Sequence, residues 1–63
     1  MAKLMVSGKE IPVDDGITIE QAVIGAGMHP DSYLYLIGGR PVPMDTVLKS
    51  DDVVKVMRVA SGG

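Results

Sequence analysis

Apolar and polar side chains alternate in two short runs at the start of the chain. Leu4 and Val6 share one face of residues 3–7, and the second run spans residues 10–14. A glycine-containing turn separates the two runs, so the pattern predicts a β-hairpin. Because Pro12 has no N–H to donate to a neighbouring strand, we expect the second strand to lie at a sheet edge.

Residues 18–27 change to a helical period. The apolar stripe at i, i+3, i+4 and i+7 consists of Ile19, Ala22, Val23 and Ala26. Thr18 and Gln21 have the spacing of a capping box at the start of the helix. Gly27 suits the left-handed conformation that closes many helices. Gly25 lies inside the predicted helix, where a close approach to a strand would explain it.

Three further strands follow the helix. Residues 33–37 are rich in strand-forming side chains, and residues 41–43 contain two prolines that restrict them to a short edge strand. Residues 53–59 form a near-continuous β-branched run, which predicts a central strand covered on at least one face. Between these strands we expect a turn or a short helical piece whose Val47 and Leu48 fill the core. The predicted order is β-β-α-β-β-β, an α+β domain.

The length of 63 residues predicts one domain, spanning residues 1–59, with residues 60–63 as a flexible tail that carries no burial signal. A chain this short buries only about 60% of the surface that its unfolded form exposes. Little room remains for both a core and an active-site cleft. We therefore expect a carrier or a binding module rather than an enzyme.

Composition and charge exclude several classes of protein. The formal net charge is -2 and the pI is near 5.0, which disfavours nucleic-acid binding and favours a protein partner. Because the chain has no cysteine, it has neither a disulfide framework nor a thiolate metal site. It has no long apolar run and no signal-peptide core, so we expect a cytoplasmic protein without membrane contact.

The element order and the final Gly62-Gly63 together resemble the β-grasp, ubiquitin-like proteins. The pattern is most similar to the small sulfur carriers of the ThiS and MoaD type, and is also similar to the small archaeal modifier proteins and the ubiquitin-related modifiers. The matching pieces are residues 6–11, 37–43, 45–48, 50–54 and 61–63. The sequence departs from the carriers at Ser50-Asp51-Asp52, where they usually have a Gly-Asp pair, and at Gly38-Gly39-Arg40, where many have Asn-Gly.

The resemblance implies a mixed four- to five-stranded sheet with one helix across one face, monomeric when free. It also implies a carrier whose Gly63 carboxylate is adenylated by a ubiquitin-activating-type enzyme. That partner uses ATP, and no cofactor is stably bound to the carrier itself. The acyl group then takes up sulfur as a thiocarboxylate for a sulfur-accepting synthase of thiamin or molybdopterin biosynthesis. Two alternatives stay open: a modifier conjugated through Gly63 to lysines of target proteins, and a plain β-grasp interaction module.

The chemistry of the tail agrees with such a role. A free α-carboxylate is ionised at neutral pH and unreactive toward nucleophiles, so it needs activation by a partner. Gly62 and Gly63 lack Cβ atoms, which lets a chain thread a narrow channel. Four extended residues beyond Val59 reach roughly 13 Å. This length allows the carboxylate to enter a second protein while the domain stays outside.

A docking surface is expected on the open side of the sheet. Val54 and Val56 should face the helix, which turns Lys55, Met57 and Val59 toward the open side. Met5 and either Tyr33 or Tyr35 join them, and a surface with Met and Tyr suits a protein partner. The predicted contact residues are Met5, Tyr35, Met57, Arg58, Val59, Ala60 and Ser61. Arg58 either pairs with an acidic group of the partner or stays solvated, and single exposed apolar residues need no function.

Other chemically active residues have simpler interpretations. His29 is the only histidine, so it has no companion for a metal site and is expected in a solvated loop. Asp14-Asp15 and Asp51-Asp52 lack calcium-loop spacing and are expected in turns. Gly38-Gly39-Arg40 precedes no helix and predicts a hairpin turn rather than a phosphate site. Lys3, Lys9, Lys49 and Lys55 are all possible conjugation sites, and the sequence favours none of them.

Overall fold

The chain opens with the predicted hairpin, in which β1 (Ala2–Val6) pairs antiparallel with β2 (Lys9–Val13). The computed structural model describes residues 1–59. Ser7 and Gly8 form the turn, with φ values of 50° and 80°. Two successive positive φ values give a turn whose twist matches that of the two strands, which explains the tight connection.

The helix α1 (Ile19–Gly25) begins at the predicted capping box. The Thr18 hydroxyl accepts a hydrogen bond from the Gln21 N–H at 3.1 Å, and the Gln21 side-chain oxygen accepts one from the Thr18 N–H at 3.0 Å. Gly27 has a φ of 82° and closes the helix, as expected. Ala26 is exposed at the C-cap, so its predicted place in the buried stripe is wrong.

A five-stranded mixed sheet forms the other layer. After the 3₁₀ turn η1 (Pro30–Ser32), the chain adds β3 (Tyr33–Ile37), β4 (Arg40–Val42) and β5 (Val53–Arg58), in the spatial order β2-β1-β5-β3-β4. The strand β5 is central, parallel to β1 and antiparallel to β3, while β2 and β4 lie at the edges. The predicted centre and both predicted edges are confirmed.

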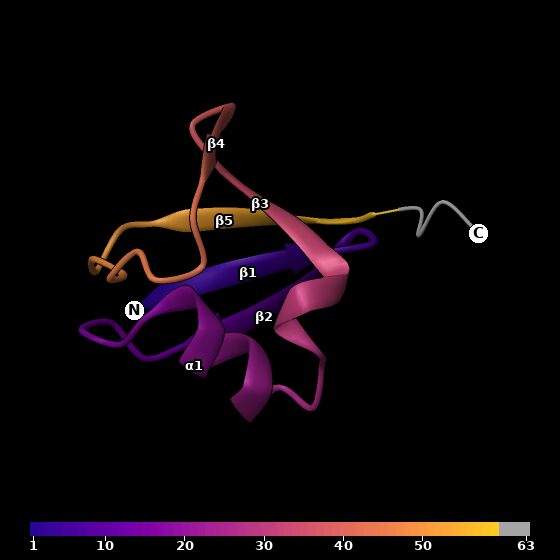
Figure 1. The fold of residues 1–63 in the computed structure, drawn as a ribbon. Helices are drawn as coiled ribbons and strands as arrows, with labels where there is room; N and C mark the ends of the chain where they lie inside the picture. Colours follow the sequence, from indigo (N-terminus) through magenta and orange to yellow (C-terminus); the bar gives the residue numbers. More distant parts are fainter. Residues whose placement is uncertain (60–63) are drawn as a thin grey trace.

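The core lies between α1 and one face of the sheet (Figure 1). Its buried residues are Ala2, Leu4, Ile19, Ala22, Val23, Tyr35, Leu48, Val54 and Val56. Burying each larger aliphatic side chain contributes about 1.5–3 kcal/mol. With so few residues, most of the core comes from one face of β1 and β5 and one side of α1.

The connection from β4 to β5 pairs with the chain that enters α1. The Gly16 N–H donates to the Leu48 C=O, and the Leu48 N–H donates to the Ile17 C=O, both at 2.8 Å. Leu48 is buried, but Val47 is 55% exposed. Adjacent side chains point to opposite sides of an extended, bridged segment, so only one of the two residues predicted to fill the core does so.

Each edge strand carries a proline at a particular position of its ladder. In a hairpin closed by a two-residue turn, the residues flanking the turn form a hydrogen-bonded pair, and such pairs then alternate. The registers place Pro12 opposite Lys3 and Pro41 opposite Leu36. At these two positions the backbone N–H and C=O would point away from the paired strand, toward the solvent at the sheet edge. Each edge therefore lacks one outward N–H, which weakens pairing with another strand.

Restoring these donors should make the sheet edges associate. We expect the double variant Pro12→Val, Pro41→Val to form dimers or larger species as its concentration rises, measured by sedimentation velocity. Pro43 lies just beyond β4, so Pro43→Val serves as the control and should sediment like the parent. Identical sedimentation of the double variant and the parent would contradict this role of the two prolines.

Replacing Gly25 at the end of α1 and replacing Gly27 just beyond it with alanine should have opposite effects on the stability of the protein. A Cβ on Gly25 meets no atom within 4 Å, so the close approach expected there is absent. Gly25→Ala should raise the free energy of unfolding by about 0.5–1 kcal/mol. Gly27→Ala should lower it by about 1 kcal/mol, because Gly27 has positive φ. Urea unfolding measures both effects, and destabilisation by Gly25→Ala would contradict the open surroundings.

Candidate functional site

The central strand directs the chain toward its last residues. β5 ends at Arg58, and the N–H of Val59 donates to the C=O of Ser32 at 3.1 Å. This bond holds Val59, the last described residue, beside η1. The predicted activation site, Gly62 and Gly63, and the predicted contact residues Ala60 and Ser61 lie outside the described residues. The candidate site is therefore the end of β5 and the surface around it.

The sheet face opposite α1 carries apolar side chains from three neighbouring strands. Alternation along β5 buries Val54 and Val56 and exposes Lys55 and Met57, as predicted. We define the open face as Met5, Leu34, Leu36, Val53, Lys55 and Met57. The registers place Lys55 between Met5 and Leu36, and Met57 beside Leu34. Leu34, Val53 and Met57 are 55%, 44% and 43% exposed, so this face is largely accessible.

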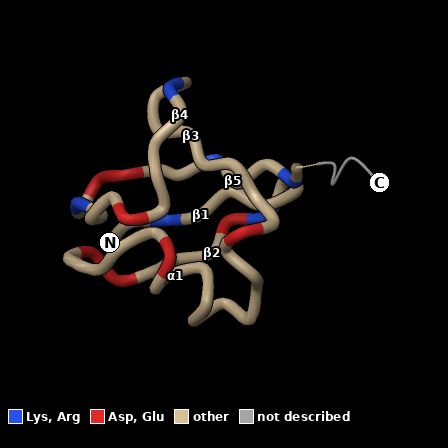
Figure 2. Tube along the Cα trace, in the orientation of Figure 1, with Lys and Arg blue, Asp and Glu red and all other residues tan. Residues whose placement is uncertain are grey.

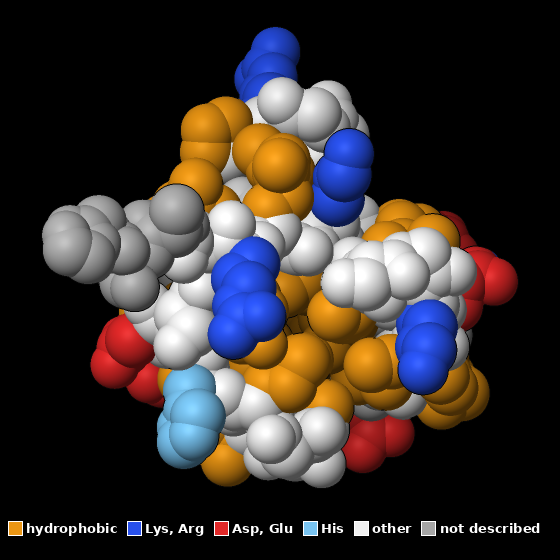
Figure 3. Space-filling model, turned by 90° about the vertical axis from the view of Figure 1, so that its right-hand side faces the viewer, with side chains coloured by type: hydrophobic (Ala, Val, Ile, Leu, Met, Phe, Trp, Pro, Cys, Tyr) orange, Lys and Arg blue, Asp and Glu red, His pale blue; other side chains and the backbone are white. Residues whose placement is uncertain are grey.

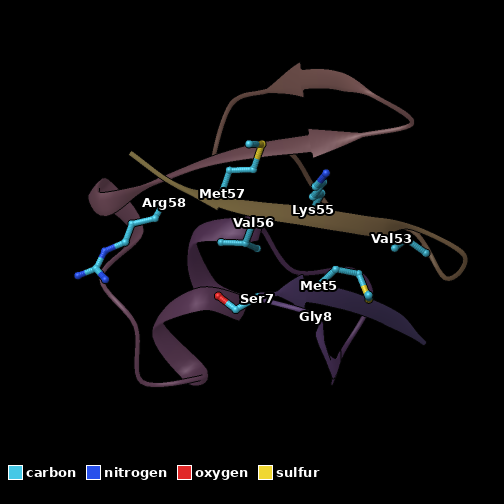
Figure 4. A pocket seen from close by; sticks show the side chains of 8 residues that line it. All are labelled: Met5, Ser7, Gly8, Val53, Lys55, Val56, Met57 and Arg58. Atoms are coloured by element: carbon cyan, nitrogen blue, oxygen red, sulfur yellow. The ribbon is translucent and has the colours of Figure 1, made fainter. Parts of the chain in front are cut away.

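A groove of about 580 Å³ runs along β1 and β5 on this face. Its lining consists of Met5, Ser7, Gly8, Val53, Lys55, Val56, Met57 and Arg58 (Figure 4). Lys55 and Met57 project from one side of β5 and Val56 projects from the other, toward the helix, while Arg58 extends away from the other labelled side chains. The two thioethers of Met5 and Met57 give the groove an adaptable apolar lining.

Charges are distributed unevenly around this groove. The Lys3 ammonium bonds the Glu10 carboxylate at 3.0 Å across β1 and β2, and no other ion pair occurs within residues 1–59. Four aspartates gather at the opposite end of the sheet, where β2 ends and β5 begins (Figure 2). They are Asp14, Asp15, Asp51 and Asp52. The end at which β5 finishes carries Arg58 and Lys9 together with Asp31, which precedes the Ser32 that bonds Val59, so its charge is more balanced.

Figure 3 shows the surface of the molecule from the end at which β5 finishes. Hydrophobic side chains gather on this side of the molecule, Lys and Arg side chains stand among them, and acidic side chains lie toward the margins (Figure 3). A surface of this composition suits a protein partner with apolar and acidic groups.

Tyr35 does not belong to the open face. It is 3% exposed, and its hydroxyl donates to the C=O of Pro30 at 2.7 Å. Its predicted place on the docking surface is therefore wrong. Because Tyr35 lies opposite the buried Val56, β3 turns both of its tyrosines toward the core side, and Tyr33 is half-buried there.

On β3, Leu34 and Leu36 occupy the positions on the open face that were expected for tyrosine. Val53 adds to the same face from β5. The sequence analysis did not single them out. Strand alternation places Leu34 and Leu36 on one face, but only the pairing with β5 decides which face that is. Val53 follows from the same alternation as Lys55 and Met57, and this signal was present in the sequence.

Residues 1–59 contain neither a candidate metal cluster nor a helix suited to cross a membrane. This part of the chain holds no group of three or more His, Cys, Asp or Glu side chains placed to bind a metal ion. His29 is exposed beside η1. No helix among these residues combines the length and apolar character needed to cross a membrane.

Comparison with known proteins identifies the family. No protein-family model matches the chain. The chain is 39% identical to small archaeal modifier protein 2 of Haloferax volcanii over 54 residues, which cover 86% of this chain and 80% of the relative. The chain belongs to the small archaeal modifier protein family. Its mixed sheet with a single helix is the β-grasp arrangement of ubiquitin-like proteins.

Membership in this family defines the kind of protein. The chain is a small ubiquitin-like protein of the modifier and sulfur carrier kind. The small archaeal modifier proteins were among the groups that the sequence resembled, so this expectation is confirmed.

The Tyr35 hydroxyl predicts a loss of stability at alkaline pH. Burial raises the pKa of Tyr35 above its ordinary value of 10.0, and the nearby Asp31 carboxylate raises it further. Folding thus favours the neutral phenol, so its contribution is complete below pH 10 and falls as the pH rises above that value. Tyr35→Phe should lower the free energy of unfolding by about 1 kcal/mol at neutral pH, through the lost hydrogen bond.

Urea unfolding at neutral pH and above pH 10 tests this expectation. The alkaline loss should be smaller in Tyr35→Phe than in the parent, whereas Tyr33→Phe should retain it. An alkaline loss of equal size in the parent and in Tyr35→Phe would assign the effect to another group.

Proposed function

We propose that the chain is a carrier whose Gly63 carboxylate is activated by a separate, ubiquitin-activating-type enzyme. The observation that carries the proposal is the central position of β5, after which the described chain reaches Val59, four residues before Gly63. A partner can then hold the domain by its surface and act on the tail. Family membership supports the same kind of role.

The activation step needs a nucleotide that the partner binds. A carboxylate oxygen of Gly63 attacks the α-phosphorus of ATP, a P–O bond breaks, and pyrophosphate leaves. The product is an acyl-adenylate, in which the unreactive carboxylate has become an acyl donor with AMP as leaving group. The chain supplies only the acyl group, so the catalytic residues of this step belong to the partner.

The acyl-adenylate has two productive fates. Attack by hydrosulfide on the acyl carbon expels AMP and gives a thiocarboxylate, which then supplies sulfur to a synthase of the thiamin or molybdopterin type. Attack by a lysine amine of a target protein expels AMP in the same way and gives an isopeptide bond. The relative's name, a modifier protein, agrees with the second fate, and both fates share the same activation step.

The open face supplies the surface by which the activating enzyme holds the domain. Leu34, Val53 and Met57 are all more than two-fifths exposed and lie on neighbouring strands. Grouped exposed apolar side chains of this kind mark interaction sites more often than scattered ones do. The other face of the sheet is covered by α1, so it cannot serve the same purpose.

The tail is tested by enlarging its last residue. The measurement combines ATP–pyrophosphate exchange with the intact mass of the protein, after incubation with a purified activating enzyme and ATP. We expect adenylation of the parent and its loss in Gly63→Leu, because a branched side chain does not fit a channel shaped for glycine. Gly25→Leu is the matched control, since its Cβ meets open space. Normal adenylation of Gly63→Leu, or none of the parent, would contradict the proposal.

The docking face is tested by placing a charge on it. Met57→Glu should raise the KM of the activating enzyme for the carrier by about tenfold or more, through loss of apolar contact. Ile24 is 57% exposed on the outer side of α1, so Ile24→Glu introduces the same charge away from the face and should leave KM unchanged. Equal KM values for the two variants would place docking elsewhere.

A further inference from the structure

Lys55 has only apolar side chains as its nearest neighbours on the open face, and the Lys3–Glu10 ion pair lies farther away, where β1 and β2 meet on the same side of the sheet. The cross-strand neighbours of Lys55 are Met5 on β1 and Leu36 on β3. Along β5, the residues on the same face are Val53 and Met57. A cation surrounded on four sides by apolar side chains differs from the usual surface lysine, which lies among polar groups.

No carboxylate of the open face neutralises Lys55 within residues 1–59. Glu10 lies opposite Met5 on β2, so its Cα is two strands away from that of Lys55, a distance of about 10 Å. The Glu10 carboxylate is already bonded to the Lys3 ammonium at 3.0 Å. Lys55 is exposed, so water hydrates its ammonium while its stem lies along the apolar surface.

A partner that covers this face removes that water. Taking an ammonium out of water is strongly unfavourable unless a charged partner is supplied in its place. A wholly apolar surface leaves Lys55 buried and unpaired, and a basic surface repels it. Only a surface with a carboxylate opposite Lys55 avoids this penalty, so a single charge discriminates between otherwise similar apolar surfaces.

We propose, building on the proposed function, that Lys55 selects the activating enzyme through an Asp or Glu carboxylate set within an apolar docking surface. The four aspartates and Arg58 favour the same orientation, while Lys49 at the aspartate end and Asp31 beside the tail end reduce this asymmetry. Asp14, Asp15, Asp51 and Asp52 lie at the far end of the sheet and repel an acidic partner, whereas Arg58 at the tail end attracts it.

Steady-state adenylation by the purified activating enzyme with ATP tests this selection. Lys55→Met keeps the length and apolar stem of the side chain but leaves the enzyme's carboxylate unpaired, so it should raise KM by about 30-fold. Lys55→Glu should raise KM further, and Lys55→Arg should stay close to the parent. The value of kcat should remain unchanged, because the proposed ion pair contributes to docking and takes no part in the reaction of the carboxylate.

Lys49→Glu is the matched charge reversal. Lys49 lies in the turn before β5, outside the open face, and its backbone N–H bonds the Asp52 carboxylate at 2.9 Å. We expect its KM to equal that of the parent. Urea unfolding verifies that every variant is folded, which is expected because Lys55 and Lys49 are both exposed.

The possible results distinguish the role of Lys55 from the proposed function on which it rests. Absence of adenylation in the parent would refute the proposed function. Adenylation of the parent with an unchanged or lower KM for Lys55→Met would refute the role of Lys55 alone, since a purely apolar docking surface gains contact from that substitution. Recovery of Lys55→Glu by an enzyme variant with one surface carboxylate changed to lysine would identify the paired residue.

Discussion

The parallel pairing of β1 with β5 at the middle of the sheet is the constraint on which the rest of the structure depends. It sets Leu4 beside Val54 and turns both toward α1, so the first and last strands of the chain form the centre of the core. The helix and two further strands must fit around this pair. Within residues 1–59, β5 is both the central strand and the last one, so the described chain ends directly after the middle of the sheet.

In a domain of this size, one face of the sheet is buried under the helix and the other face stays exposed. The helix covers the face that carries Leu4, Val54 and Val56, and the open face stays available to a partner. The two prolines at the edges direct association away from strand pairing. In the proposed function, a partner recognises the open face and the reaction takes place at the Gly63 carboxylate, so docking and reaction use different parts of the chain.

Features that depend on nearby residues could be predicted from the sequence, and features that depend on pairing between distant strands could not. The capping box of Thr18 and the alternation of β5 are local, and both were correct. The orientation of β3 is set by its register with β5, so the sequence pattern placed Tyr35 on the wrong face. The prediction that Val47 fills the core was wrong for the same reason, because its exposure depends on a bridge to Thr18.

The central claim is that a partner enzyme binds the folded domain and activates the carboxylate of Gly63. Mass spectrometry of the protein from its native cells tests this claim most directly, through the intact mass of the carrier and the masses of lysine peptides from other proteins. The account predicts a pool that is heavier by the exchange of one carboxylate oxygen for sulfur, or a Gly-Gly remnant on lysines. A carrier found only as the unmodified acid, with no remnant on any lysine, would contradict it.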